Sequence, residues 1–120
     1  MENVKPTELS EGKSHNLLLF TFIMEYKRGT YIWQGESESK ETACFKWVEE
    51  LKTDEIAGFS KKTRKKLHTR LLDVDYAPIA IKNCENVWCM LFTIKKKSIL
   101  VNIIQTEKPI QNSTVQSSAF

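Results

Sequence analysis

Segments with strand character enclose a central stretch with helical periodicity, and this order constrains the fold more than any other feature of the sequence. Five short segments rich in apolar, aromatic and β-branched residues predict strands, at residues 17–26, 30–38, 78–81, 87–94 and 98–106. Residues 27–29 (KRG), with Gly29 available for a positive φ, and residues 95–97 (KKK) predict the tight turns of two hairpins. Hairpins pair antiparallel strands, so the predicted sheet is mostly antiparallel.

The middle of the chain has the periodicity of helices. Ser39 offers an N-cap hydroxyl to a helix that begins at Lys40, and a second helix is expected from about Ser60 to Leu72. One face of the first helix collects the apolar residues Ala43, Cys44, Trp47, Val48 and Leu51. The order strand, strand, helix, helix, strand, strand, strand predicts an α+β fold, in which about five strands form a mostly antiparallel sheet with both helices packed on one face.

The length of 120 residues fits one domain. We expect this domain to span residues 15–107, after a flexible N-terminal segment (1–14) and before a disordered C-terminal tail (108–120), because both ends are polar and poor in structure-forming patterns. The N-terminal sequence lacks the pattern of a secretory signal, and no run approaches the roughly 20 apolar residues that span a membrane. A cytoplasmic location, without membrane contact, is the resulting expectation.

No residue pattern predicts a cofactor, a metal site or catalysis. The three cysteines, Cys44, Cys84 and Cys89, are odd in number and include no CxxC pair, which argues against a disulfide framework and a redox motif. A ribonuclease-like acid–base pair would need His15 and His68 to converge, and nothing in the sequence brings them together. We therefore expect a protein that uses no cofactor and no metal and is not an enzyme.

The charged side chains are unevenly distributed. The segment SKKTRKKLHTR (60–70) holds six basic residues and no acidic one. Without these six, 12 basic side chains remain against 15 acidic ones, although the whole chain carries a net charge of +3. The surface is therefore expected to have a basic region and an acidic region, either of which could contact a partner.

The basic segment has two interpretations. Most of its charges lie opposite Leu67 and Leu71 on the helical wheel, as on a solvated outer face, and only Arg64 departs from this division. The alternative is a nucleic-acid-associated regulatory or binding module that uses Lys61, Lys62, Arg64, Lys65 and Lys66. The segment lacks the aromatic, asparagine and glutamine side chains that stack on bases or read them, so nucleic acid is the disfavoured partner.

An acidic region at the end of the second predicted strand and along the first helix is the favoured contact surface. Its candidate residues are Glu36, Glu38, Glu41, Phe45 and Glu49. The acids would speed association with a basic partner, and Phe45, which falls outside the apolar arc of its helix, would supply desolvated contact area. Phe45 could instead pack under the neighbouring helix, and the sequence leaves both possibilities open.

Two stretches carry a resemblance to known proteins: GTYIWQGESES (29–39), followed by the helix with Trp47, and NVWCMLFTIKKKSILVNIIQTE (86–107). Their order resembles that in a group of small bacterial proteins. The chain also resembles, as a small protein without a cofactor motif and with a two-signed surface, the immunity proteins of contact-dependent growth inhibition and other polymorphic toxin systems. This likeness implies a non-enzymatic bacterial protein that binds a cognate toxin domain and neutralises it by occluding its active site. It carries over no individual binding residues.

Overall fold

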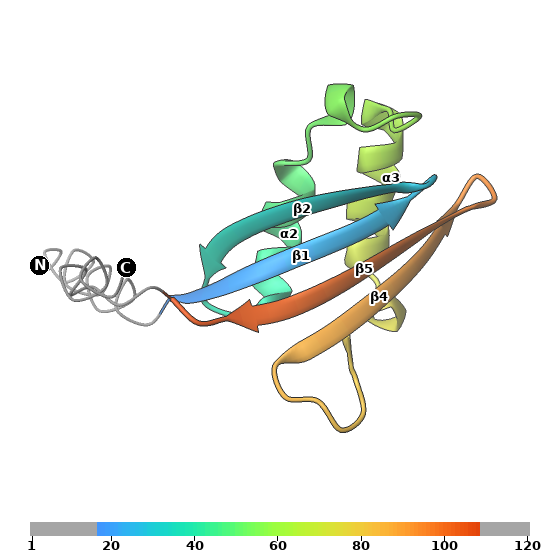
Figure 1. Ribbon diagram of the computed structural model, residues 1–120. Coiled ribbons are helices and arrows are strands. Elements are labelled where there is room, and N and C mark those ends of the chain that lie inside the picture. The colour runs from blue at the N-terminus through green and yellow to red at the C-terminus, as the bar shows by residue number, and fades with distance from the viewer. Residues whose placement is uncertain (1–16, 109–120) are drawn as a thin grey trace, which may run out of the picture.

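The structure, a computed structural model, describes residues 17–108 (Figure 1). Its strands and longer helices are β1 (Leu18–Tyr26), β2 (Gly29–Ser37), α2 (Lys40–Glu49), α3 (Lys61–Leu71), β3 (Ile79–Ala80), β4 (Val87–Ile94) and β5 (Lys97–Thr106). Single turns of 3-10 helix, Thr53–Glu55 and Val74–Tyr76, precede and follow α3. This order confirms the predicted α+β class. The predicted flexible segment 1–14 and all but the first residue of the predicted tail 108–120 lie outside the described residues.

The five strands form one antiparallel sheet in the order β2-β1-β5-β4-β3. The nine-residue β2 lies at one edge, and the two-residue β3 lies at the other. Both α2 and α3 cover the same face of the sheet, as predicted (Figure 1). No element within residues 17–108 covers the opposite face, which we refer to as the open face.

Alternation along the strands explains why the helices pack on one face only. Phe20, Phe22, Met24 and Tyr26 of β1 are buried towards the helices, and the residues between them point to the open face. Trp47 of α2 is fully buried and stacks on Phe22, with 5.2 Å between the ring centroids. Truncating a core tryptophan to alanine typically costs about 3–5 kcal/mol. This contact therefore anchors α2 to the sheet.

Both helices begin where the sequence indicated. Ser39 Oγ accepts a hydrogen bond from the Thr42 backbone N–H at 3.1 Å, and Thr42 Oγ1 accepts one from the Ser39 N–H at 3.2 Å, which completes a capping box. Ser60 Oγ likewise accepts from the Thr63 N–H at 3.1 Å at the start of α3. These hydroxyls satisfy backbone donors that would otherwise be unpaired at the helix ends.

Both hairpin turns consist of two basic residues with positive φ. Lys27 and Arg28 have φ values of 48° and 70°, and Lys95 and Lys96 have values of 54° and 66°. Positive φ at both central residues is the pattern of type I′ turns, whose twist matches that of the flanking strands. The expectation that Gly29 supplies the positive φ is therefore wrong. Because the turn is only two residues long, Gly29 is already the first residue of β2.

Candidate functional site

Within the part of the chain that the structure describes, one edge of β2 pairs with no other strand, and the hairpin turn fixes which backbone groups face this free edge. Tyr26 and Gly29 flank a two-residue turn and so form a hydrogen-bonded pair, after which hydrogen-bonded and non-hydrogen-bonded pairs alternate. The backbone N–H and C=O groups of Tyr31 and Trp33 therefore bond to β1. The alternate residues, whose groups point away from β1, are Thr30, Ile32, Gln34 and Glu36.

One end of this edge is covered by a lysine. Lys46 Nζ, from α2, donates to the backbone oxygen of Glu36 at 2.9 Å, in agreement with the outward direction of that oxygen. Within residues 17–108, no hydrogen bond reaches the outward-pointing backbone groups of Thr30, Ile32 or Gln34. The free part of the edge is therefore the stretch from Thr30 to Gln34.

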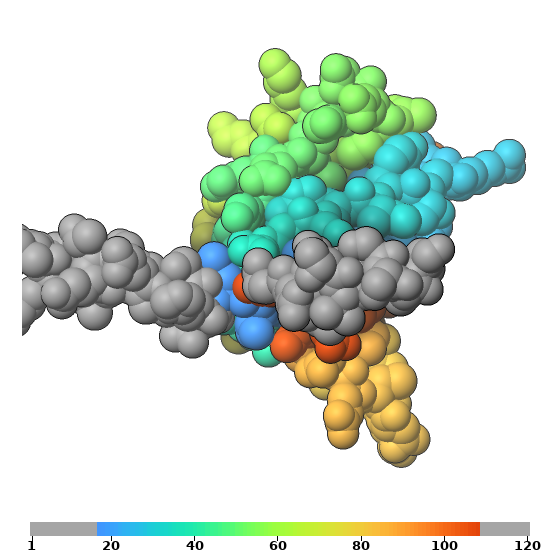
Figure 2. Space-filling model, turned by 60° about the vertical axis from the view of Figure 1, so that its left-hand side comes forward, coloured from blue at the N-terminus to red at the C-terminus, as the bar shows by residue number. Residues whose placement is uncertain are grey.

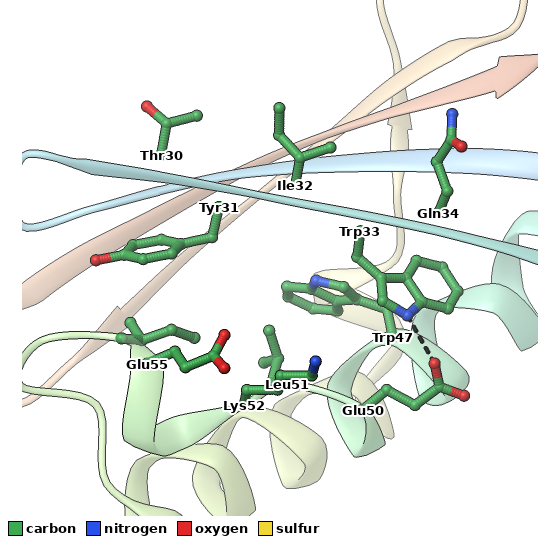
Figure 3. Close-up of a pocket in the computed structure, with 11 residues that line it drawn as sticks. Thr30, Tyr31, Ile32, Trp33, Gln34, Trp47, Glu50, Leu51, Lys52 and Glu55 are labelled. Carbon is green, nitrogen blue, oxygen red and sulfur yellow. Dashed lines mark hydrogen bonds between the residues drawn. The ribbon is translucent and has the colours of Figure 1, made fainter.

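A hollow of about 430 Å³ runs beside this stretch, between β2 and the chain that follows α2 (Figure 3). It is lined by residues 30–34, Trp47, residues 50–52, Glu55 and Ile56, and is named here the edge groove. The side chains at positions 31 and 33 point into the groove, whereas those at 30, 32 and 34 point to the other side of β2 (Figure 3). The groove is thus bounded by aromatic side chains and by a free backbone edge.

The two aromatic side chains of β2 lean away from each other, each over a glycine. A Cβ on Gly29 would lie 2.5 Å from Tyr31 Oη, and a Cβ on Gly35 would lie 2.4 Å from ring atoms of Trp33. Tyr31 therefore leans towards the start of β2 and Trp33 towards its end, with the Trp47 ring between and beneath them (Figure 3). Residues two apart share one face of a strand, so the Gly-x-Tyr and Trp-x-Gly spacings create this space.

The groove wall formed by Trp33 is held in place from two sides. Its indole Nε1–H donates to Glu50 Oε1 at 2.8 Å, and its ring packs edge-on against Phe22, with 5.3 Å between the centroids. Glu50 and Glu55 place two carboxylates among the lining residues, against the single ammonium of Lys52. The groove therefore combines a fixed aromatic wall with a net acidic rim.

The structure separates the five residues of the predicted acidic contact surface. Glu36 points to the open face of the sheet, where its carboxylate lies 3.8 Å from Lys108 Nζ. Glu38 is exposed in the link between β2 and α2. Glu41 pairs with Lys40 Nζ at 2.9 Å in the first turn of α2, and this hydrogen bond lowers the pKa of the Glu41 carboxyl. These acids therefore lie on both sides of the sheet rather than on one surface.

The remaining two residues, Phe45 and Glu49, lie beside α3. Phe45 is half-buried, with its ring centroid 5.5 Å from that of His68, so it packs under the neighbouring helix, which is one of the two possibilities left open above. Glu49 borders a shallow hollow whose other charged residues, including Lys61 and Lys65, come from α3. The predicted acidic and basic regions consequently meet where α2 and α3 pack together.

The predicted basic surface is also divided. Its four lysines, Lys61, Lys62, Lys65 and Lys66, are exposed on α3. Arg64 is different, because its Nη1 donates to the backbone oxygen of Leu51 at 3.2 Å and fastens α3 to the chain after α2. This contact explains why Arg64 departed from the amphipathic division of the helical wheel.

A second group of cations, at the tips of the two hairpins, was not predicted. Lys27 and Arg28 from one turn border a hollow of about 380 Å³ together with Lys96 and Lys97 of the other hairpin. The light-blue tip of the β1–β2 hairpin projects from the body of the protein (Figure 2). The sequence shows that both turns are basic, but their proximity follows only from the pairing of β1 with β5.

The helix α3 lies close to this basic end of the sheet. Tyr26 is the residue just before the first hairpin turn. Its Oη donates to the backbone oxygen of Gly58, which lies shortly before α3 in the chain, at 3.0 Å. Near its end, Arg70 Nη1 donates to the backbone oxygen of Thr93 at 2.8 Å, close to the second turn. The exposed lysines of α3 and the hairpin tips therefore belong to one end of the molecule.

All three cysteines are free. Burial raises the pKa of the Cys44 thiol to about 12, and the Glu41 carboxylate adds to this shift. Among residues 17–108, no group of three or more His, Cys, Asp or Glu side chains is placed to hold a metal ion. In the same part of the chain, no helix is long and apolar enough to cross a membrane.

Comparison with known proteins gives no match: no protein-family model fits the chain, and no curated protein or solved structure is significantly similar to it. Its function is therefore inferred from the edge groove and the charged surfaces themselves.

Proposed function

We propose that the protein is a non-enzymatic binding module that recognises another protein through the edge groove. We further propose that it acts in the bacterial cytoplasm as an immunity protein, which binds a cognate toxin domain and neutralises it by occluding its active site. The main observation in favour of recognition through the edge groove is the space between the aromatic rings of Tyr31 and Trp33, which lies beside a free strand edge. The immunity role is supported by the resemblance to immunity proteins given above.

The groove has properties that favour protein contacts. Tyrosine and tryptophan contribute disproportionately to binding at protein interfaces, because they offer a large contact area and lose few rotamers. Trp33 is already held by Glu50 and Phe22 in the free protein. Little side-chain entropy would therefore be lost on binding, and a pre-organised wall of this kind raises affinity.

The charges around the groove favour a basic partner. Glu50 and Glu55 lie on its rim, whereas the predicted contacts Glu36, Glu38 and Glu41 lie outside the residues that line the groove. Charges of this kind accelerate association and make its rate depend on salt. A toxin domain with a cationic active-site cleft, as a nuclease would have, is complementary to this arrangement.

A toxin domain encoded beside this protein provides the test. Reversal of both rim charges, by Glu50→Lys with Glu55→Lys, is expected to slow association at low salt by about ten-fold or more and to abolish protection of toxin-expressing cells. The matched control is Glu85→Lys with Asp75→Lys, which changes the net charge equally at exposed positions outside the groove. Equal association rates for the two double variants would contradict the groove as the contact surface. A toxin that neither variant nor wild type binds would contradict the immunity role.

A second candidate function is association with nucleic acid through the basic end, and one observation favours it. Lys27, Arg28, Lys95 and Lys96 all occupy positive-φ turn positions, where Asn and Gly are usual. The left-handed conformation costs other residues about 1–2 kcal/mol each. The presence of four cations at these positions, near the exposed lysines of α3, favours a role for concentrated charge. Such a surface would bind phosphate backbones without reading bases.

Gel retardation of DNA and RNA tests this alternative. Reversal of the four exposed α3 lysines should abolish retardation near physiological salt. Replacement of Lys27-Arg28 by Asn-Gly should weaken it while stabilising the fold, because the turn then has its favoured residues. No retardation of wild-type protein even at low salt would eliminate the nucleic-acid function.

A further inference from the structure

Among the described residues 17–108, the free edge of β2 is long, regular and largely unprotected. All nine residues of β2 pair in register with β1, and none of them is proline. Proteins usually block such an edge with a bulge, a proline, a charge or a covering segment, because its unpaired backbone groups accept another strand. Within residues 17–108, the backbone hydrogen bond from Lys46 Nζ to Glu36 protects only the far end.

The unprotected stretch presents a short ladder of donors and acceptors. The N–H and C=O groups of Thr30, Ile32 and Gln34 point outward, and successive members of this set are about 6.8 Å apart along an antiparallel strand. An extended segment of another chain has backbone groups with the same spacing. It can therefore form hydrogen bonds with all three residues, which supply affinity, while pockets for its alternate side chains supply specificity.

The edge groove lies where alternate side chains of an added strand would fall. A strand beside β2 continues the sheet over the chain that follows α2, and every second side chain points to that layer. A side chain of the added strand that lies opposite Tyr31 or Trp33 points into the groove, where the space between these two aromatic rings favours an apolar group. Its neighbours on the same face meet Glu55 on the Tyr31 side and Glu50 on the Trp33 side, which favours basic groups (Figure 3).

We infer that the partner contributes an extended segment that pairs with β2 as a further strand, with an apolar side chain between Tyr31 and Trp33 and basic side chains towards Glu50 and Glu55. On the open face, the segment also covers Ile32, a residue that is 67% exposed in the free protein. The inference rests on the proposed function only in taking the edge groove as the contact surface. It holds whether or not the partner is a toxin.

A blocked peptide, acetyl-Thr-Arg-Thr-Leu-Thr-Arg-Thr-amide, is the probe, titrated to millimolar concentration into the isotope-labelled full chain. The backbone amide resonances of Thr30, Ile32 and Gln34 are expected to shift, since their N–H groups gain hydrogen bonds. The same peptide methylated on the alternate backbone nitrogens that would face β2 should bind about ten-fold more weakly or worse, equivalent to about 1.4 kcal/mol. A peptide with glutamate in place of both arginines should also bind more weakly.

Two substitutions at one position separate recognition of the main chain from recognition of the side chain. Ile32→Pro removes an outward N–H and leaves the ladder to β1 intact, because Ile32 is not hydrogen-bonded to β1 and proline is tolerated on strand edges. Ile32→Ala keeps the N–H and removes the side chain. Peptide binding should be about ten-fold weaker for Ile32→Pro than for Ile32→Ala, a difference that corresponds to about one lost hydrogen bond.

Several outcomes would overturn strand addition. The first is that Ile32→Pro and Ile32→Ala bind the peptide with equal affinity. The second is that wild type binds the methylated and unmethylated peptides with equal affinity. The third is that the amide resonances of Thr30 and Gln34 do not shift at millimolar peptide. A dimer whose Thr30 and Gln34 amides are protected from hydrogen exchange without peptide would place a second copy on the edge, and would also overturn it. The peptide comparison with wild type decides the question even if Ile32→Pro fails to fold.

The toxin experiment keeps the two proposals apart. A toxin domain that binds Ile32→Pro and Ile32→Ala equally, but not the variant with Glu50 and Glu55 reversed, would overturn strand addition and support the proposed function. Peptide binding with the expected shifts, in the absence of binding to any toxin domain, would support strand addition and count against the immunity role.

Discussion

The indole of Trp33 and the carboxylate of Glu50 are joined by a hydrogen bond of 2.8 Å that links the free edge strand to the end of the first helix. Trp33 belongs to β2, and Glu50 is the residue that follows α2. The shape of the edge groove therefore depends on how α2 packs against the sheet. Both partners can be changed independently, which makes their coupling measurable.

A double-mutant cycle should show that Trp33 and Glu50 stabilise each other. Trp33→Phe removes the indole donor, and Glu50→Ala removes the acceptor. We expect a coupling energy of about 0.5–1 kcal/mol in urea unfolding, because the bond involves a charged acceptor but is partly exposed to water. The pair Trp33→Phe with Glu55→Ala is the control, and it should show additive effects. Additivity in both cycles would mean that the bond does not hold the groove wall.

Gly35→Ala should disturb the groove from beneath the Trp33 ring. The added Cβ would lie 2.4 Å from ring atoms of Trp33, so the indole must move. Overpacking of this kind typically costs about 1–3 kcal/mol. Urea unfolding and the tryptophan fluorescence spectrum are the measurements. If the ring is the cause, Gly35→Ala should cost much less in a chain that already carries Trp33→Val, and an equal cost in both chains would refute this explanation.

Arg64 should matter for stability, unlike its basic neighbours on α3. Arg64→Met removes the hydrogen bond to the Leu51 backbone oxygen and should lower the free energy of unfolding by about 1–2 kcal/mol. Lys65→Met removes the same charge from an exposed position and should change it by less than about 0.5 kcal/mol. Equal losses in denaturant unfolding would show that the contribution of Arg64 is only its charge.

The Cys44 thiol should make the folded state less stable in alkaline solution. Its pKa is about 12 in the folded protein against an ordinary value of 9.0, so between these values the unfolded state binds fewer protons than the folded state. The free energy of unfolding should therefore fall as pH rises through this interval, by up to about 1.4 kcal/mol per pH unit from this group. Below the lower value the contribution is fully present.

Comparison of wild type with Cys44→Ala isolates this effect, because the other titrating groups are common to both chains. The difference in their free energies of unfolding should shrink above about pH 9, where the unfolded wild-type thiol ionises. A difference that stays constant up to pH 11 would show that the folded thiol ionises as readily as the unfolded one. Alkylation under native conditions should also modify the exposed Cys84 before the buried Cys44.

The elements of this fold could be predicted because their signals are local. The apolar, aromatic and β-branched residues of the segment 17–26 and the hydroxyl of Ser39 before a helical period are read from consecutive residues, and both predictions are confirmed. The length of the first hairpin turn could not be read in this way. Gly29 looked like the turn residue, but register with β1 makes it part of β2.

The edge groove could not be predicted because it arises between segments that are distant in sequence. The spacing of Gly29 from Tyr31 and of Trp33 from Gly35 is visible in the sequence. It creates a groove only because these residues lie on a strand with one face towards a helix. The acids that were predicted to form one contact surface also do not lie together. Glu36 lies on a strand whose alternate side chains point to the open face, and a tally of charge along the chain does not contain that information.

The two edges of the sheet differ greatly in length, since β2 has nine residues and β3 has two. This inequality limits self-association. If two copies met through β2, related by a two-fold axis, the result would be a closed pair whose outer edges are both the short β3 strands. Each outer edge then offers a third copy only the two residues of β3 and the part of β4 beyond it, where Arg70 Nη1 already donates to the backbone oxygen of Thr93. The chain can therefore keep one edge receptive to a partner without the open-ended stacking that leads to fibres.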